Sequence, residues 1–142
     1  MLKFQIVTPE RVVFEDEVDQ VTMMTSDGEI TVLPHHLPLV SVLRPGELRY
    51  KKVGEDLVMA VSGGFVEVRP DNTLVVLADT AELAHEIDVS RAEIAKAKAE
   101  KLMQEVRSKE DVDYATLQVN LERALTRLKV GNKYRKIRGN AK

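Results

Sequence analysis

The spacing of the hydrophobic residues changes near residue 87, and this change constrains the fold more than any other feature of the sequence. Before it, short runs rich in Val, Ile, Leu and Thr recur between turn-forming residues, as in "VEVRPDNTLVVL". After it, hydrophobic residues recur every three or four positions. Alternation with period two indicates half-buried strands, whereas a three-four spacing indicates an amphipathic helix. The chain is therefore predicted to be an α+β protein whose strands come first.

Residues 1–86 are predicted to form an antiparallel β-sandwich. In the stretch quoted above, Val66 and Val68 fall on one face of a strand, Glu67 and Arg69 fall on the other, and "PDN" supplies a tight turn. Several such strands at spacings of about 8–12 residues favour a sandwich or a barrel. The two glycines that precede the stretch allow a backbone conformation that a side chain would deny.

Residues 87–142 are predicted to form an αα-hairpin with a basic C-terminal tail. Each helix carries one apolar stripe, and the two stripes consist of Ala92, Ala95, Ala99, Leu102 and Val106, and of Tyr114, Leu117, Leu121, Ala124 and Leu128. The segment 108–113 reads as the connector, and Gly131-Asn132 reads as the C-terminal cap of the second helix. Short isolated helices are marginal in water, so the hairpin is expected to lean on the sandwich or on a partner.

Charge is distributed unevenly along the chain. From Arg123 to Lys142 there are eight basic residues and no acidic one. Because the net charge of the whole chain is −2, residues 1–122 carry a charge of −10. A basic tail on an acidic body suggests an anionic partner for the tail, and the alternative is a solvated C-terminus without a partner.

The residue types present exclude several functions. Without cysteine the chain has no disulfide, no Cys-liganded zinc and no thiol catalysis. Adjacent His35 and His36 point in different directions in most backbones, and no glycine-rich phosphate loop or Ser-His-Asp pattern occurs. We therefore predict a non-catalytic protein with neither a metal nor a cofactor. No apolar run approaches the ~20 residues of a membrane span, and "MLKFQIVTPE" lacks the pattern of a signal peptide. A cytosol-facing protein without direct membrane insertion is expected.

The stretch "IDVSRA" (87–92) marks the start of the first helix. Asp88 is one candidate for the N-cap, which places Arg91 at the third helical position, and Ser90 with Glu93 in a capping box is the other. Arg123 and Arg127 lie four residues apart on the second helix, whose C-terminal end comes near this start in an antiparallel hairpin. Three arginines converging at a helix N-terminus are the outline of a phosphate site.

Taken in order, "DGEITVLPHHLPL", "AVSGGFVEVRPDN", "LADTAE", "IDVSRA" and "ALTRLKV" resemble the epsilon subunit of the F-type ATP synthase over essentially the whole chain. The resemblance implies a sandwich that binds the gamma subunit and the c-ring, and a hairpin that inhibits ATP hydrolysis when it extends toward the alpha and beta subunits. The c-ring contacts of the family fall on Glu29 and His36, and His35 replaces the glycine of that loop.

Some bacterial members of the family bind regulatory ATP on the compact hairpin. The matching positions in this chain are Glu82, Ile87, Asp88, Arg91, Ala92, Arg123 and Arg127. Where the family has a further arginine on the first helix, this chain has Lys98, which provides a point charge without a bidentate fork.

The sequence is also compatible with two other functions. One is a free-standing ATP-sensing module, and the other is nucleic-acid binding through "KVGNKYRKIRGNAK", which we do not expect because the rest of the chain is acidic. The resemblance implies a peripheral location on the cytoplasmic face of the bacterial plasma membrane, and it also allows the plastid thylakoid.

Overall fold

The computed structural model of the chain describes residues 1–106 and 114–140. Within these ranges there are ten strands, one short 3-10 helix and two α-helices. The elements are β1 (Leu2–Val7), β2 (Val12–Val18), β3 (Gln20–Thr25), β4 (Gly28–Val32), β5 (Leu39–Leu43), β6 (Gly46–Lys52), β7 (Glu55–Val61), β8 (Gly64–Val68), β9 (Thr73–Ala78), β10 (Ala81–Leu83), η1 (Ala84–Glu86), α1 (Val89–Val106) and α2 (Tyr114–Asn140). The predicted sandwich followed by two helices is confirmed, and the connector predicted at 108–113 lies outside the described residues.

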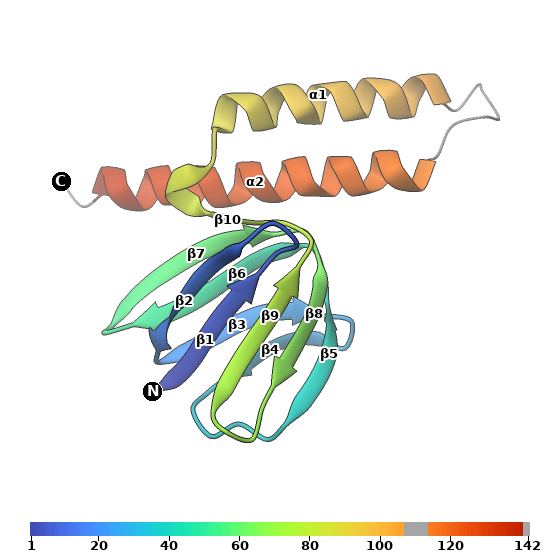
Figure 1. Ribbon diagram of the computed structural model, residues 1–142. Helices are drawn as coiled ribbons and strands as arrows, with labels where there is room; N and C mark the ends of the chain where they lie inside the picture. The colour runs from blue at the N-terminus through green and yellow to red at the C-terminus, as the bar shows by residue number, and fades with distance from the viewer. Residues whose placement is uncertain (107–113, 141–142) are drawn as a thin grey trace.

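The strands form one sheet that curls over itself around a common core (Figure 1). Its order is β10-β7-β6-β3-β5-β8-β9-β1-β2, and β4 pairs with β3 off this path. Neighbouring strands run antiparallel except for β1 and β9, which are parallel. The largest side chains buried in this core are aliphatic, apart from Phe4, and they include Leu2, Ile6, Met23, Leu43, Leu48, Met59 and Leu74.

The predicted turn at "PDN" joins β8 to β9. Val66 pairs with Val76 and both are buried, while Asn72 in the turn adopts a φ of 65°. Gly64 at the start of β8 has a φ of +141°, and a Cβ atom there would lie 1.9 Å from the carbonyl oxygen of Leu77. The predicted requirement for glycine at this point therefore comes from a close approach of two strands as well as from the backbone angle.

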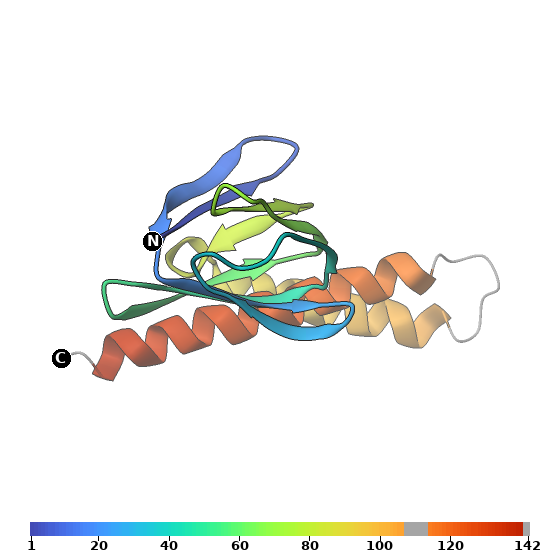
Figure 2. The ribbon, with the colours of Figure 1, turned by 90° about the horizontal axis from the view of Figure 1, so that it is seen from below.

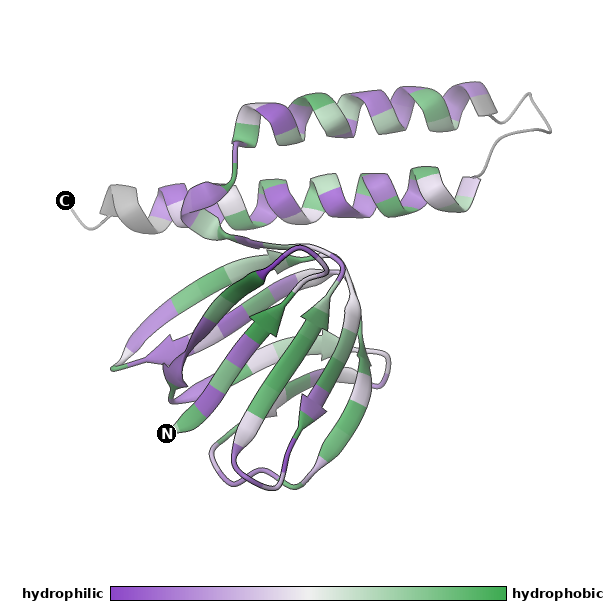
Figure 3. Cartoon of the chain, in the orientation of Figure 1, coloured by the Kyte–Doolittle hydropathy of each residue, from purple (hydrophilic) through white to green (hydrophobic). Residues whose placement is uncertain are grey.

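The two helices lie side by side and antiparallel, and α2 lies between α1 and the sandwich (Figures 1 and 2). Hydrophobic and hydrophilic residues alternate along both helices, so neither is apolar all round (Figure 3). Ala92, Ala99, Leu117 and Ala124 are buried between the elements as their spacing predicts, whereas Ala95 and Tyr114 of the predicted stripes are exposed. No helix in the described ranges is both long and apolar enough to cross a membrane.

Docking of the hairpin on the sandwich involves a small apolar cluster. Its buried members are Val58 and Ala60 of β7, Ala84 of η1 and Val130 of α2, and its half-buried members are Ile87 and Tyr134. Because the cluster is so small, the hydrophobic free energy that holds the hairpin in place is modest compared with that of the sandwich core.

The prediction that α2 ends at Gly131-Asn132 is wrong, because the helix continues to Asn140. Gly131 is buried against the start of α1, where a Cβ atom would lie 2.8 Å from Cγ2 of Val89 and 3.2 Å from Cγ2 of Ile87. The glycine is thus required by close helix packing rather than by a left-handed cap. This contact also confirms that the C-terminal part of α2 lies near the start of α1.

Candidate functional site

Asp88 caps α1. The backbone N–H of Arg91 donates a hydrogen bond to Oδ1 of Asp88 at 3.1 Å, and the N–H of Ala92 donates to the Asp88 carbonyl oxygen. Arg91 is therefore at the third helical position, in agreement with the first of the two predicted registers. The carboxylate of Asp88 satisfies a free N–H group and interacts favourably with the positive end of the helix dipole.

A cationic groove runs between the two helices and has a volume of about 380 Å³. Three cationic side chains line it, those of Lys98, Arg123 and Arg127. The remaining lining residues are Ala95, Ala99, Leu102, Leu117, Asn120 and Ala124. Small alanine side chains on both helices leave the space, and helical spacing places the three cations along it.

Arg127 and Arg123 differ in their interactions within the groove. Arg127 is ion-paired with Glu82 of β10, and its Nε lies 3.1 Å from each carboxylate oxygen. Arg123 contributes an Nε that is buried and has no hydrogen-bond partner within the described residues. A buried donor without a partner costs free energy, so this nitrogen would gain from an anionic ligand.

The structure brings some of the predicted ATP-site residues together and separates others. A small cavity between α2 and strands β7 and β10 is lined by Glu82, Arg123 and Arg127. Arg91 does not line the groove, because its guanidinium turns toward Asp88, with Nε 3.7 Å from Oδ2, and its side chain is 82% exposed. Ile87 and Ala92 are packing residues at this end of the hairpin, and Ala92 is fully buried.

Two polar residues of the groove, Lys98 and Asn120, are not among the predicted site residues. Helical spacing alone indicates Asn120, which is three positions before Arg123 on the same helix, whereas Lys98 joins the groove through the pairing of the two helices.

The two predicted c-ring residues lie in different elements of the sandwich, Glu29 in β4 and His36 in the loop before β5. Glu29 is exposed on β4 and pairs with Arg49 of β6 at 3.0 Å. His36 is half-buried in the loop before β5, where its Nδ1 lies 2.7 Å from the Leu37 carbonyl oxygen. His35 has a φ of 64°, which is the left-handed conformation that a glycine would adopt. The backbone of this loop therefore accommodates the substitution of glycine by histidine.

An apolar row crosses five strands on the outer face of the sheet. Cross-strand pairing aligns Val42 with Phe65, Phe65 with Leu77, and Leu77 with Val7, which in turn pairs with Val12. Phe65 is 56% exposed, and Val12, Val42 and Leu77 are exposed to a similar extent. A contiguous exposed apolar surface of this kind marks a protein–protein contact.

Comparison with known proteins identifies the family. The family model "ATP synthase, Delta/Epsilon chain, beta-sandwich domain" matches residues 1–84, and "ATP synthase, Delta/Epsilon chain, long alpha-helix domain" matches residues 85–132. The chain therefore belongs to the ATP synthase delta/epsilon chain family.

The family includes delta and epsilon chains, and the relatives to which this chain is similar are named ATP synthase epsilon chain. It is 48% identical to that of Herpetosiphon aurantiacus, over 91% of this chain and 93% of the relative. It is 49% identical to that of Dehalococcoides mccartyi, over 95% of each chain, and 45% identical to that of Halalkalibacterium halodurans, over 93% of this chain and 98% of the relative. These relatives confirm the resemblance to the epsilon subunit.

Solved structures share the fold. A chain in the Euglena gracilis mitochondrial ATP synthase (OSCP, F1 and c-ring, rotational state 1) superposes with a TM-score of 0.75 at 24% identity, covering 90% of this chain and 79% of that chain. A chain in the central stalk and c-ring of the Tetrahymena thermophila enzyme has a TM-score of 0.59 at 16% identity, covering 94% and 95%. At these identities the likeness establishes the fold alone.

Proposed function

We propose that this chain is a non-catalytic rotor subunit in the central stalk of a proton-translocating F-type ATP synthase. Its sandwich binds the gamma subunit and the c-ring, and its hairpin inhibits ATP hydrolysis when it extends toward the alpha and beta subunits. In the assembled enzyme it is peripheral on the cytoplasmic face of the bacterial plasma membrane.

The observation that carries the proposal is the unequal packing of the two parts of the chain. The sandwich has a large buried core, whereas the hairpin rests on it through one small apolar cluster and ion pairs such as Glu82–Arg127. An element held by so little free energy has a second position within reach, and a partner that binds the extended form shifts the population toward it.

Deleting residues 88–142 in the reconstituted holoenzyme tests the inhibitory role. The sandwich is expected to remain assembled with gamma, because its core and the apolar row are intact, and the rate of ATP hydrolysis is expected to rise. Unchanged hydrolysis by a fully assembled enzyme would remove the inhibitory function while leaving the rotor function in place.

Contact with gamma is assigned to the apolar row, and contact with the c-ring to Glu29 and His36. The row offers a continuous exposed apolar surface, and Glu29 in β4 and His36 in the loop before β5 offer polar groups. Replacing both polar residues with alanine is expected to weaken coupling of the assembled enzyme to the proton gradient without releasing the chain from gamma.

Regulatory ATP is assigned to the cationic groove. The groove exists only when the helices are paired in the compact hairpin, so a nucleotide bound there stabilises this form by RT ln(1 + [L]/Kd), about 2.7 kcal/mol at a hundredfold excess over Kd. Arg123 and Arg127 face the phosphates, and Arg91, with its long exposed side chain, reaches the ligand by rotating away from Asp88.

Calorimetric titration of the isolated chain with magnesium-free ATP tests this assignment. Wild type is expected to bind, and Arg91→Ala and Arg127→Ala are expected to lose binding. Arg69→Ala, which removes an arginine paired with Glu67 on the sandwich, is the matched control and should bind like wild type. If wild type shows no heat up to millimolar ATP, the groove does not bind ATP and inhibition is set by partners alone.

The cationic groove also supports a second candidate, a free-standing ATP-sensing module. The two functions differ in their partners. Retention of the chain on immobilised gamma subunit, lost on mutation of the apolar row, supports the rotor function, whereas ATP binding without retention supports the sensor.

A further inference from the structure

Glu47 of β6 is a buried carboxylate that lies between two cations from different parts of the molecule. Its side chain is only 9% exposed. Nζ of Lys133, on α2, lies 2.7 Å from Oε1, and Nε of Arg49, on the same strand, lies 3.8 Å from this oxygen. Arg49 in turn pairs with Glu29 of β4 at 3.0 Å. The four residues form a line of alternating charge from the hairpin to the surface of the sandwich.

We propose that Glu47 is a switch carboxylate, which binds Lys133 at 2.7 Å and Arg49 only at 3.8 Å while the hairpin is docked, and which draws Arg49 into close contact once the hairpin has left. The position of the hairpin is thereby transmitted to Glu29, which loses its partner as Arg49 moves. This inference rests on the proposed function in so far as the hairpin undocks in the enzyme, but its test uses the isolated chain.

The physical reason is the attraction between Glu47 and the two cations beside it. Glu47 lies on the face of β6 opposite the core residues Leu48 and Tyr50, where α2 packs, so undocking exposes it to water. A carboxylate that loses one of two neighbouring cations is attracted to the other. Lys133 is available only in the docked state, because it belongs to α2. Arg49 is two residues from Glu47 on one strand, hence on the same face of the sheet, and it remains nearby in both states.

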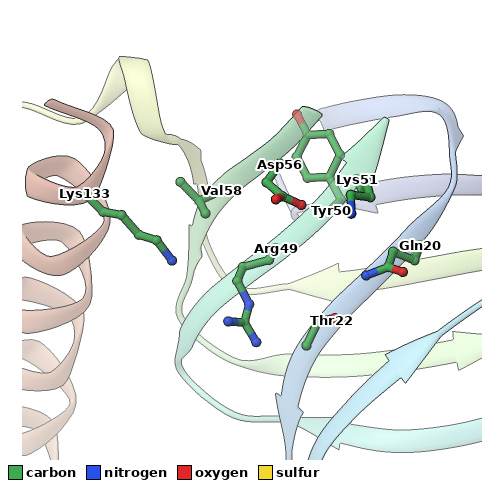
Figure 4. Close-up of a pocket in the computed structure, with 8 residues that line it drawn as sticks. All are labelled: Gln20, Thr22, Arg49, Tyr50, Lys51, Asp56, Val58 and Lys133. Carbon is green, nitrogen blue, oxygen red and sulfur yellow. The ribbon is translucent and has the colours of Figure 1, made fainter. Parts of the chain in front are cut away.

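Lys133 and Arg49 line the same cleft between α2 and the sandwich. Figure 4 shows the side chain of Lys133 extending from α2 toward Val58 and Arg49 over this cleft of about 390 Å³. Lys133 and Arg49 are both about half exposed, so water and salt reach both cations of the line. The exchange of partners therefore needs no rearrangement of the sandwich core.

The test measures undocking through a single reactive thiol. The chain has no cysteine, and Val130 is fully buried in the cluster beneath the hairpin. In Val130→Cys, the labelling rate of the thiol reports the ratio of undocked to docked chains even when undocking is rare. Val66→Cys, buried in the sandwich core, labels only on global unfolding and provides the reference rate.

The switch predicts opposite signs for its two cations. Lys133→Gln should raise the labelling rate at position 130 by about three- to tenfold. Arg49→Gln should lower the rate by about two- to threefold, because the undocked state then loses the attraction between Glu47 and Arg49, whereas the docked state keeps Lys133 beside Glu47. Glu29→Gln should raise the labelling rate, because loss of the Glu29 carboxylate frees Arg49 to compete with Lys133 for Glu47. Lys129→Gln, an exposed lysine one turn earlier, is the control and should leave the rate unchanged.

In a Glu47→Gln background all of these effects should disappear. A rate that rises or stays constant in Arg49→Gln, or a Lys133→Gln rate equal to that of Lys129→Gln, would overturn the switch. Equal rates at positions 130 and 66 would also overturn it, because the hairpin would then not undock separately. None of these results bears on the deletion of residues 88–142, whose effect on hydrolysis tests the inhibitory function alone.

Discussion

Glu82 on β10 and Arg127 on α2 lie 3.1 Å apart, and their ion pair joins the last strand of the sandwich to the cationic groove. Both side chains are largely shielded from water, so the pair is screened less than the surface pairs of the chain. The same arginine thus contributes to docking of the hairpin and is available to an anionic ligand, which links the two processes.

Lys98→Arg is expected to increase the affinity of the groove for ATP by about tenfold. A guanidinium forms two parallel hydrogen bonds to a phosphate, whereas the lysine ammonium acts as a point charge. Calorimetric titration of both proteins measures the change. Lys101→Arg, on an exposed position of the same helix, is the control, and equal affinities in wild type and Lys98→Arg would argue against a phosphate at this position.

Phe65→Ser is expected to abolish retention of the chain on immobilised gamma subunit. The side chain lies in the middle of the apolar row and is 56% exposed, so its loss removes contact area without opening a cavity in the core. The free energy of unfolding should change by no more than about 0.5 kcal/mol. Val53→Ser, at the exposed tip between β6 and β7, should be retained like wild type. Full retention of Phe65→Ser would place the gamma contact elsewhere.

Gly131→Ala is expected to favour undocking of the hairpin. Alanine stabilises a helix interior by about 1 kcal/mol relative to glycine whether or not the hairpin is docked. In the docked state, however, its Cβ would lie 2.8 Å from Val89, whose branched side chain is stiff, and such overpacking costs about 1–3 kcal/mol. The labelling rate of a thiol at position 130 measures the shift. Asn132→Ala, on the exposed side of α2, should not increase this rate, and a matching result for both variants would contradict the packing role of Gly131.

Asp16→Asn is expected to make the stability of the chain less sensitive to acid. The hydrogen bond from Lys52 lowers the pKa of Asp16 below its usual 3.8, and the backbone N–H of Glu17 contributes in the same direction. Because the folded-state pKa is the lower one, this carboxylate stabilises the fold above pH 3.8 and the stabilisation is lost as the pH falls through the lowered pKa. Urea unfolding across this range measures the slope. Asp71→Asn, in the β8–β9 turn, should retain the wild-type slope, and an unaltered slope in Asp16→Asn would refute the prediction.

Tyr50→Phe is expected to reduce the loss of stability in alkali. Burial raises the pKa of Tyr50 above its usual 10.0, and the nearby charge of Asp16 adds to the effect. The folded state holds the phenolic proton more tightly, so stability is fully present below pH 10.0 and declines as the pH rises through the raised pKa. Unfolding midpoints of both proteins above pH 10.0 test this. The packing of the ring against Phe4 and Phe14 is preserved in the variant, and identical alkaline profiles would show that Tyr50 does not titrate in this range.

Local pattern predicts most of the strands and both helices, but neither the short β10 and η1 nor the long-range arrangement of the strands. Val66 and Val68 alternate with charged residues, and "PDN" turns the chain back, so β8 and β9 were visible in the sequence. The parallel pairing of β1 with β9 and the position of β3 between β5 and β6 join segments far apart in the chain. Such pairings depend on which faces are buried together, and no local period encodes them.

The site shows the same limit. Helical spacing placed Arg123 and Arg127 on one face, and the structure finds both in one groove. The sequence did not decide between Asp88 and Ser90 as the cap because both are good capping residues. Gly131 resembled a helix end because its packing partners, Ile87 and Val89, are more than forty residues away and are visible only in three dimensions.

The parallel pairing of β1 with β9 also sets the order of events during synthesis. β1 completes its pairing only when Leu77 has left the ribosome, and the hairpin has not yet emerged at that moment. Emerging domains fold as units, with the N-terminal one first. We expect the sandwich to be finished before α2 leaves the ribosome. Each newly synthesised hairpin then finds a folded sandwich with Glu47 in place. The docked position is therefore the first one that the hairpin occupies.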